Sequence, residues 1–380
     1  MKLTVEQEQF KQEMKTLLHS EKFTKMCHES KKYGGDYDAR VIYKALGKIG
    51  ALSPNLPVEF GGRNLGFVSS GVLAEELTNA SIPESLFVLS NFIVSNLIYL
   101  YGEKQQKERY LREFSSGSKY SIVLFSEPKY GSDLASIETQ AVKKGDKFII
   151  SGRKVYSMKT HLADYGLLAA RTGNFDSKYR GITLFLLPLS SKGVKINVVD
   201  AVSDENFFEV FLDQVELSEN NIIGQIDEGW TIINNALSLE RTGLDYYIRA
   251  QKWLKFIMDA LSTEKKHTHS QLLSQLALET RMAKEFTFDI LDTLDKNLPI
   301  SETQGAIAKY YSSELANKIT IAGIKMLGKS SLEKGPFGIQ NQAYDNFNSI
   351  AREAPGLLIS AGASEIMLET ITRNELYQIN

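Results

Sequence analysis

The sequence predicts an α+β protein in which a β-rich middle segment separates two helical segments. Apolar residues recur at helical spacing from Val5 to about Phe114, and the same period returns after Gly229-Trp230. From Ser121 on, the intervening chain has short runs of β-branched and aromatic residues between turn residues. We therefore expect three domains: an N-terminal helical domain at 1–119, a β domain at 120–222 and a C-terminal helical bundle at 223–380.

The first helical segment contains amphipathic helices and one longer apolar stretch. Phe10, Met14 and Leu17-Leu18 recur at helical spacing, and a second helix is predicted from Phe67 to Thr78. The apolar stretch from Ser85 to Tyr101 is interrupted by several serines and asparagines. A membrane span needs about 20 predominantly apolar residues, so we expect a buried core helix here.

The strands predicted for the middle segment are short. They span Ser121 to Phe125, Phe148 to Ile150, Gly166 to Ala170, Ile182 to Leu187, Val194 to Val199, and Phe207 to Val215. Gly145-Asp146 and Ser151-Gly152 fall between such runs, and we interpret both pairs as turns. In the C-terminal segment, the helical period is broken near Asn297-Leu298-Pro299 and near Lys334-Gly335-Pro336.

Composition excludes several classes of function. The 380 residues are 43% hydrophobic and carry a formal net charge of −2, which argues for a packed globular protein and against nucleic acid as a partner. The single cysteine, Cys27, cannot form an internal disulfide and fits a reducing compartment. The N-terminus lacks the charged-then-apolar run of a signal peptide, so we expect a cytoplasmic protein that acts away from membranes.

Common cofactor and metal motifs are weak. No Gly-x-Gly-x-x-Gly follows a predicted strand, so there is no typical dinucleotide cradle. His267 and His269 lie in the polar run from Ser262 to Ser270, which we interpret as a solvated loop rather than a metal site.

The most informative segment runs from Leu124 to Asp133, with the sequence LFSEPKYGSD. A strand stops at Pro128 and then turns through Gly131 into Ser132. Such a turn exposes backbone N–H groups and a hydroxyl, which suits an anion or the polar edge of a ring. An ordinary strand-ending turn is the alternative interpretation.

With its surroundings, this segment resembles the acyl-CoA dehydrogenase family, whose signature is Thr-Glu-Pro, two residues, Gly-Ser-Asp, then a hairpin ending in Gly-x-Lys-x-Trp. Here the hairpin reads DKFIISGRKVY, from Asp146 to Tyr156. Other family landmarks appear in the same order along nearly the whole chain. They are Asn55 to Gly62, Tyr101 to Leu111, Glu240-Arg241, and Gly362 to Ile366.

The resemblance implies the family fold, with a β-barrel-like middle domain and a C-terminal four-helix bundle, and it implies FAD at their junction. It assigns cofactor contacts to Phe125, Ser126, Gly131, Ser132, Tyr156, Ser157, Met158, Ala363 and Glu365, and substrate contacts to Ser132, Arg241 and Gly362. Tyr156 stands where the family usually has a tryptophan, and an aromatic ring still supplies a flat apolar wall. Met158 replaces a hydroxyl residue that donates a hydrogen bond to flavin N5, a bond that a methionine side chain cannot donate.

The reaction that the resemblance implies needs a carboxylate to remove the α-proton of an acyl thioester. Most family members carry that base where this sequence has Ala361, whereas a minority branch uses the Glu of Glu-Arg, which is Glu240 here. Apolar residues from Ile233 to Tyr247 recur at helical spacing, and we expect Glu240 in the middle of this stripe. An ion pair with an arginine across a helix interface is the alternative.

Arg241 and Asp245 are spaced for an ion pair within one helix. Such a pair would stabilise the helix, or Arg241 would help to position the flavin or the base.

Two family motifs are degraded. The arginine and phenylalanine that reach the FAD of a neighbouring subunit are missing from 263–267, and of a second motif only Gly328 remains, flanked by Lys325 and Lys329. The resemblance nevertheless implies a homo-oligomer, a dimer or tetramer, in which Lys325 and Gly328 approach a partner's FAD. Solvated lysines at a helix end are the alternative interpretation of Lys325 and Lys329.

These departures motivate the hypothesis of a specialised member that acts on acyl or aminoacyl groups, such as prolyl, tethered to a carrier protein rather than to CoA. The electron acceptor would be an electron-transfer flavoprotein or oxygen. Two alternatives stay open: a flavin-dependent oxidase or monooxygenase on the same fold, and a helical partner protein without flavin.

Overall fold

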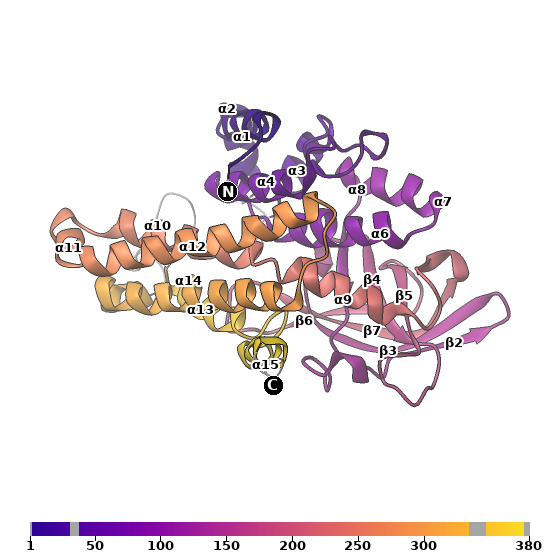
Figure 1. Ribbon diagram of the computed structural model, residues 1–380. Helices are drawn as coiled ribbons and strands as arrows, with labels where there is room; N and C mark the ends of the chain where they lie inside the picture. Colours follow the sequence, from indigo (N-terminus) through magenta and orange to yellow (C-terminus); the bar gives the residue numbers. More distant parts are fainter. Residues whose placement is uncertain (1, 31–37, 334–346, 376–380) are drawn as a thin grey trace.

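The computed structural model describes residues 2–30, 38–333 and 347–375. Figure 1 shows the N-terminal helices lying over the junction between a β sheet and a C-terminal helical region, which extends away from the sheet. The predicted order of a helical, a β and a second helical part is therefore confirmed. The boundaries after residues 119 and 222 stay a prediction.

The elements that the structure describes in the N-terminal part are all helices. Its elements are α1 (Val5–Leu18), α2 (Glu21–Ser30), α3 (Arg40–Gly47), η2 (Val58–Phe60), α4 (Gly66–Asn79), α5 (Ser85–Phe87), η3 (Val88–Val94), α6 (Ser95–Tyr101), α7 (Lys104–Gln106), η4 (Lys107–Leu111) and α8 (Arg112–Ser115). The predicted helix at Phe67 to Thr78 is α4, one residue longer at each end. The apolar stretch forms α5, η3 and α6 and is buried from Ser85 to Ile98, as predicted. Among the described residues, no helix is both long enough and apolar enough to cross a membrane.

The middle part forms one sheet in the strand order β6-β7-β3-β2-β4-β5-β8, and β1 pairs with β4. The strands are β1 (Ser121–Leu124), β2 (Gln140–Lys144), β3 (Lys147–Met158), β4 (Tyr165–Arg171), β5 (Ile182–Pro188), β6 (Val194–Val199), β7 (Phe207–Ser218) and β8 (Ile222–Ile223), and the short helices η5 (Leu134–Ser136), η6 (Thr160–Leu162) and η7 (Glu219–Asn221) connect them. The turn predicted at Gly145-Asp146 is confirmed, and it joins the antiparallel strands β2 and β3. Sequence reasoning missed β2, because its residues are mostly exposed and give no alternating apolar pattern.

The turn predicted at Ser151-Gly152 is wrong. Both residues lie inside β3, where its register against β7 shifts between Ile150 and Gly152. A Cβ atom on Gly152 would lie 2.4 Å from the hydroxyl oxygen of Thr139. The glycine is therefore required by close packing at a β-bulge and does not mark a reversal of the chain.

The C-terminal part consists of α9 (Gly229–Glu240), α10 (Leu244–Ala260), α11 (Thr263–Thr268), α12 (Ser270–Asp295), α13 (Glu302–Leu327), η8 (Lys329–Leu332), α14 (Phe347–Leu357) and α15 (Ser364–Glu375). α10, α12 and α13 pack together, and α14 and α15 both pack against α13. The break predicted near Asn297 separates α12 from α13, whereas the break predicted near Lys334 lies outside the described residues. The polar run interpreted as a solvated loop instead contains α11.

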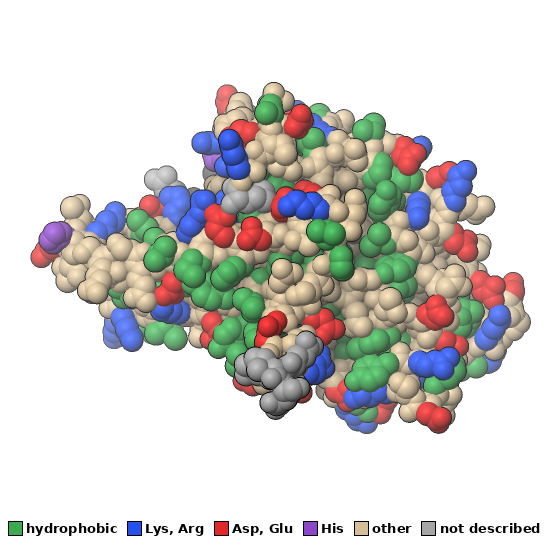
Figure 2. Space-filling model, in the orientation of Figure 1, with side chains coloured by type: hydrophobic (Ala, Val, Ile, Leu, Met, Phe, Trp, Pro, Cys, Tyr) green, Lys and Arg blue, Asp and Glu red, His purple; other side chains and the backbone are tan. Residues whose placement is uncertain are grey.

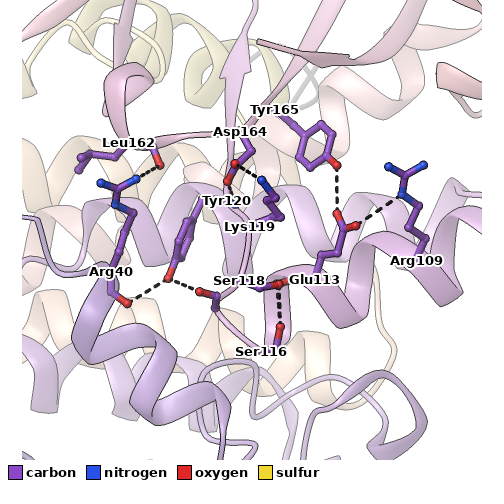
Figure 3. Close-up of polar contacts among 11 residues, drawn as sticks. Arg40, Arg109, Glu113, Ser116, Ser118, Lys119, Tyr120, Leu162, Asp164 and Tyr165 are labelled. Carbon is purple, nitrogen blue, oxygen red and sulfur yellow. Dashed lines mark hydrogen bonds and ion pairs between the residues drawn. The ribbon is translucent and has the colours of Figure 1, made fainter. Parts of the chain in front are cut away.

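Polar contacts join the N-terminal helices to the sheet. Lys119 donates to Asp164 at 2.7 Å, and the hydroxyl of Tyr165 donates to Glu113 at 3.1 Å. Figure 3 shows these side chains meeting where the chain leaves α8 and enters β1. The contacts fix the first strand of the sheet relative to the helices above it.

A buried ion pair fixes the turn that follows β1. Lys154 of β3 is fully buried, and its ammonium donates to the Glu127 carboxylate at 2.8 Å and to the Phe125 carbonyl at 3.0 Å. Glu127 also accepts backbone N–H bonds from Glu138 at 2.7 Å and from Thr139 at 2.9 Å. This network ties the turn at 125–133, which we call the signature turn, to the strand that ends at Met158.

The pKa values in this pair follow from burial and pairing. Burial raises the pKa of Glu127, but Lys154 and the N–H donors outweigh it, so the pKa lies below its ordinary value. Burial lowers the pKa of Lys154 to about 8, and Glu127 opposes this only in part. Both groups are thus charged near neutral pH.

Removing one partner of this pair leaves an uncompensated buried charge. We expect Lys154→Met to lower the free energy of unfolding by about 3–5 kcal/mol, measured by denaturant titration. The double variant Lys154→Met/Glu127→Gln should recover part of this loss because it buries no charge. The matched control is Lys147→Met, which changes another lysine of β3 and removes an exposed ion pair with Glu216. It should change the free energy of unfolding very little. Equal unfolding midpoints for Lys154→Met and the control would contradict a structural role for the pair.

Candidate active site

A cavity of about 480 Å³ lies where the three parts of the chain meet. Its apolar wall includes Val88, Leu89, Phe92 and Ile93 of η3, Phe207 of β7, and Leu239 and Leu244 at the α9–α10 junction. The C-terminal part also contributes 351–353 of α14 and the segment that follows this helix. Apolar walls with a few convergent polar groups are typical of small-molecule sites.

Glu240 lines this cavity as the last residue of α9. Our expectation that it lies in the middle of one helical stripe is wrong. α9 ends at Glu240, Gly243 adopts a left-handed conformation with φ of 82°, and α10 begins at Leu244. The break turns the chain immediately after the carboxylate, so Glu240 stands at a helix end.

The carboxylate of Glu240 makes no hydrogen bond or ion pair with any residue that the structure describes, contrary to the alternative of a pair with arginine. Burial raises its pKa to about 7, and the negative charge of Asp245 adds to this effect. The positive charges of Arg241 and Lys309 act in the opposite direction. A carboxyl group with this pKa can accept a proton near neutral pH.

Three side chains hold the segment that follows α14 beside Glu240. Lys309 of α13 is fully buried and donates to the carbonyl of Leu357 at 3.2 Å, at the end of α14 where carbonyl groups lack helical partners. The hydroxyl of Tyr246 donates to the carbonyl of Ser360 at 3.1 Å. Arg241 donates to the carbonyl of Ala361 at 3.1 Å.

Of the two alternatives for Arg241, the ion pair with Asp245 is wrong, because Arg241 turns toward Ala361 and Asp245 pairs with Arg249 at 3.3 Å. Gly362 has φ of 110°, and a Cβ atom on it would lie 3.3 Å from the Arg241 guanidinium. The two C-terminal family landmarks, Glu240-Arg241 and the segment that begins at Gly362, therefore lie side by side next to the cavity that Glu240 lines.

Sequence reasoning missed a charged network at the same cavity. Arg249 of α10 forms ion pairs with Asp245, Glu353, Glu84 and Glu205. Glu205 also pairs with Lys159 at 2.9 Å. The only sequence signal was an Asp and an Arg four residues apart on a helix, because the other carboxylates come from distant segments.

The residues predicted around the signature turn lie at the end of β1. Phe125 is buried, and the carbonyl of half-buried Ser126 accepts a hydrogen bond from Val155 of β3 at 3.0 Å. Gly131 and Ser132 are exposed. Their backbone N–H groups and the Ser132 hydroxyl bond to no described group, and a Cβ on Gly131 would meet open space.

The end of β3 joins this turn to the cavity. Tyr156 is 62% exposed and has a left-handed backbone with φ of 60°. Met158 and its pairing partner Phe207 on β7 both line the cavity. The hydroxyl of Ser157 lies within 2.8 Å of the Thr160 hydroxyl and donates to the Phe208 carbonyl at 3.2 Å, so its side chain is engaged away from the cavity lining.

These features fit FAD. Free N–H groups and a hydroxyl at Gly131 and Ser132 suit phosphate or the polar edge of the flavin, and exposed Tyr156 offers a ring face. The same strand end carries Met158 into the cavity that contains Glu240.

The remaining predicted cofactor residues divide into two groups. Ala363 and Glu365 lie at the start of α15, which packs against α13. Lys325 and Gly328 lie at the other end of α13, where Lys265 of α11 donates to the Met326 carbonyl at 3.3 Å. Figure 1 shows α11 at the end of the bundle farthest from the sheet, so one chain does not bring Lys325 and Gly328 to the signature turn.

Comparison with known proteins gives matches in all three parts of the chain. Models of the N-terminal, middle and C-terminal domains of acyl-CoA dehydrogenase match residues 4–118, 123–215 and 227–376. "Acyl-CoA dehydrogenase FadE29" of Mycobacterium tuberculosis is 29% identical over 249 residues, which cover 64% of this chain and 62% of that protein. The chain thus spans about three fifths of the length of this curated relative.

Solved structures share the fold. The crystal structure of acyl-CoA dehydrogenase from Geobacillus kaustophilus superposes with a TM-score of 0.85 at 24% identity, covering 98% of both chains. The structure of the prolyl acyl carrier protein oxidase AnaB superposes with a TM-score of 0.82 at 18% identity, covering 98% of this chain and 99% of that one. At these identities the similarity establishes the fold alone.

Proposed function

Because the chain belongs to the acyl-CoA dehydrogenase family, we propose that it is an FAD-dependent oxidoreductase that removes two hydrogens from the α and β carbons of an acyl thioester. The observation that carries this proposal is Glu240, a carboxylate that forms no ion pair with any described residue and lies on the wall of a cavity that also reaches Met158 of the β domain.

In this proposal Glu240 removes the α-proton. Thioester α-protons are weakly acidic, so a base whose pKa lies near the working pH transfers protons most effectively. Burial in the apolar cavity raises the pKa of Glu240 to about 7, which meets this need. FAD, when bound, supplies the acceptor for the β-hydrogen, which leaves as hydride toward flavin N5.

Lys309, Tyr246 and Arg241 act as positioning residues for this base. Each holds the backbone of the segment between Leu357 and Ala361, which forms the cavity wall beside Glu240. Fixing that wall keeps the acyl carbons within reach of the carboxylate and keeps water out.

The cofactor would lie between the turn after β1 and the end of β3. We propose contacts from Phe125, Ser126, Gly131, Ser132 and Tyr156 through the groups described above, and from Met158 by packing. The hydroxyl of Ser157 would support Thr160 rather than contact the cofactor directly.

We further propose a homo-oligomer, a dimer or tetramer. Lys325 and Gly328 lie far from the signature turn, so they can assist a cofactor only in a second subunit. α12 and α13 expose the apolar side chains Leu278, Met282, Ile307 and Ile321, and Figure 2 shows hydrophobic side chains gathered over this part of the bundle. An exposed apolar surface of this kind favours association.

The thiol that carries the acyl group as a thioester would belong to CoA or to a carrier protein. The degraded motifs motivate the carrier-protein form, and a prolyl acyl carrier protein oxidase is among the proteins with the same fold. The electron acceptor would be an electron-transfer flavoprotein or oxygen, and oxygen uptake during turnover separates the oxidase alternative from a dehydrogenase.

Replacing the base tests its role directly. Glu240→Gln should bind FAD normally but slow anaerobic bleaching of the flavin by substrate about 10²–10⁴-fold, because the amide cannot accept the proton. Glu369→Gln, which changes an exposed carboxylate on α15, serves as the control and should bleach at the wild-type rate. Bleaching of the Glu240→Gln variant at the wild-type rate would assign the proton transfer to another group.

The pH dependence of the reduction rate reports the ionisation of Glu240. The base acts when deprotonated, so the rate should rise with pH through the pKa of about 7. Lys309→Met removes a positive charge that lowers this pKa, so the midpoint should move to higher pH. Lys318→Met changes a lysine on the same helix as Lys309 and removes its ion pair with Glu279 of α12, so it should leave the midpoint unchanged. A midpoint that falls or stays fixed in Lys309→Met would refute electrostatic coupling to the base.

The choice between CoA and a carrier protein is tested by presenting the same acyl group as a thioester of each. We expect a higher kcat/KM for the carrier-protein thioester than for the matched CoA thioester, measured with the same artificial electron acceptor. Equal values for both would exclude a preference for the carrier protein.

A further inference from the structure

We propose that Thr242 is a positioning residue for Glu240, because its hydroxyl joins the end of α9 to the start of α10 and thereby holds the carboxylate on the cavity wall. This inference rests on the proposed function, in which Glu240 is the base. The observations that carry it are the hydrogen bonds of Thr242, the backbone of Gly243 and the surroundings of the Glu240 carboxylate.

The side chain of Glu240 depends on its backbone for its direction. Its carboxylate lies on the cavity wall and forms no hydrogen bond or ion pair with any residue that the structure describes. Glu240 is also the last residue of α9, and helix ends fray. The base therefore stays on the cavity wall only if another group fixes the last turn of the helix.

Thr242 fixes this turn through one hydroxyl group. The residue has no exposed surface, and its hydroxyl donates to the carbonyl of Leu239 at 2.9 Å. The same oxygen accepts the backbone N–H of Leu244, the first residue of α10, at 3.5 Å. The last carbonyls of one helix and the first N–H groups of the next lack partners within their own helices. One side chain thus bonds both helix ends, and the bonded groups flank Glu240.

Backbone bonds reinforce the same junction. The N–H of Thr242 also donates to the carbonyl of Leu239, at 3.4 Å. The carbonyl of Gly243 accepts the N–H of Tyr247 at 2.9 Å, which is the first hydrogen bond inside α10. The break between the two helices is therefore an ordered turn with bonds on both of its sides.

Gly243 packs the break against the helical bundle. Its φ of 82° is left-handed, a conformation that glycine adopts without a steric cost. A Cβ atom on it would lie 2.9 Å from the Thr287 hydroxyl oxygen, 3.1 Å from the Ala308 carbonyl oxygen and 3.2 Å from the Ser312 hydroxyl oxygen. α12 and α13 therefore lie directly against the break. The hydroxyl of Thr242 thus links the end of α9 to a part of the chain that the bundle holds in place.

The charges near Glu240 make a released carboxylate detectable. Burial raises the pKa of Glu240 to about 7, Asp245 raises it further, and the positive charges of Arg241 and Lys309 lower it. If the end of α9 frays, the carboxylate turns toward solvent or toward one of these cations. Either movement stabilises the charged form and lowers the pKa. The pKa of Glu240 therefore reports whether Thr242 holds the helix end.

A spectroscopic titration tests the inference without any substrate. Thr242→Val removes the hydroxyl and keeps a branched side chain, whereas Thr242→Ser keeps the hydroxyl. Infrared difference spectra of the FAD-loaded protein, each against the same protein with Glu240→Gln, record protonated Glu240 by its carboxyl C=O band. We expect the wild-type midpoint near the pKa of about 7, a lower midpoint in Thr242→Val and the wild-type midpoint in Thr242→Ser.

Two outcomes of this titration would overturn the proposal. One is a midpoint in Thr242→Val that equals or exceeds the wild-type midpoint. The other is a midpoint in Thr242→Ser as low as that of Thr242→Val, because the hydroxyl would then not be the cause. Neither variant changes the charge of any group around the base. Besides the three groups that act on Glu240 most strongly, the charged residues lining the cavity are Glu205, Arg249, Arg352 and Glu353.

Kinetics separate positioning from substrate binding and from stability. With hexanoyl-CoA as the probe, Thr242→Val should slow the saturating rate of anaerobic flavin bleaching by up to about 100-fold, as expected for a misplaced reacting group. The FAD content and the half-saturating concentration of hexanoyl-CoA should stay close to the wild-type values. The control Thr320→Val removes another buried hydroxyl, which donates to the Ala316 carbonyl at 3.0 Å on α13, and should bleach at the wild-type rate. Equal bleaching rates in Thr242→Val and the control would contradict positioning by Thr242.

Failure of the proposed function looks different in these experiments. If neither hexanoyl-CoA nor a hexanoyl carrier-protein thioester bleaches the wild-type flavin while the infrared midpoint follows the hydroxyl, dehydrogenation is wrong and positioning of Glu240 by Thr242 stands. If hexanoyl-CoA bleaches the wild-type flavin and the midpoint is the same with and without the hydroxyl, dehydrogenation stands and the positioning role falls.

Discussion

The buried ion pair between Glu127 and Lys154 is the constraint on which the rest of the site depends. A lysine with no exposed surface must be paired, and here one carboxylate and one carbonyl satisfy it. The pair joins the turn after β1 to the end of β3, so the N–H groups at Gly131 and Ser132 and the side chains of Tyr156 and Met158 acquire fixed positions. Without this tie, the turn would be an ordinary loop at the end of a strand.

Glu240 and Glu127 are both buried carboxylates, but their surroundings differ. Glu127 meets an ammonium and two N–H donors, which keep its pKa below the ordinary value. Glu240 meets no such donor among the described residues, and its pKa rises to about 7. One carboxylate is thus fixed as a charge that holds the fold together, whereas the other is left able to exchange a proton. The difference lies in the partners that tertiary contacts supply and not in the residue type.

The break between α9 and α10 connects the base to its surroundings. Because the chain turns through Gly243, Glu240 ends one helix while Asp245, Tyr246 and Arg249 occupy the first turns of the next. This arrangement places three features at one cavity: the base, Tyr246, which bonds the neighbouring wall segment, and the charged network around Arg249. The wall itself comes from 357–361, more than a hundred residues after Glu240, and is held by Lys309 of α13, Tyr246 of α10 and Arg241 at the break after α9.

The amino-acid sequence by itself determined the order of helical, β and helical parts, the turn at Gly145-Asp146 and the identity of Glu240 as a candidate base, because these features depend on local period, on turn residues and on spaced motifs. The turn predicted at Ser151-Gly152 was wrong, because the sequence alone does not distinguish a glycine that close packing against Thr139 requires from a glycine in a turn. Only the tertiary structure decided that Arg241 holds Ala361, that Asp245 turns to Arg249, and that Glu84, Glu205 and Glu353 join them. Those carboxylates are brought together by packing between distant segments, and no local pattern records such an encounter.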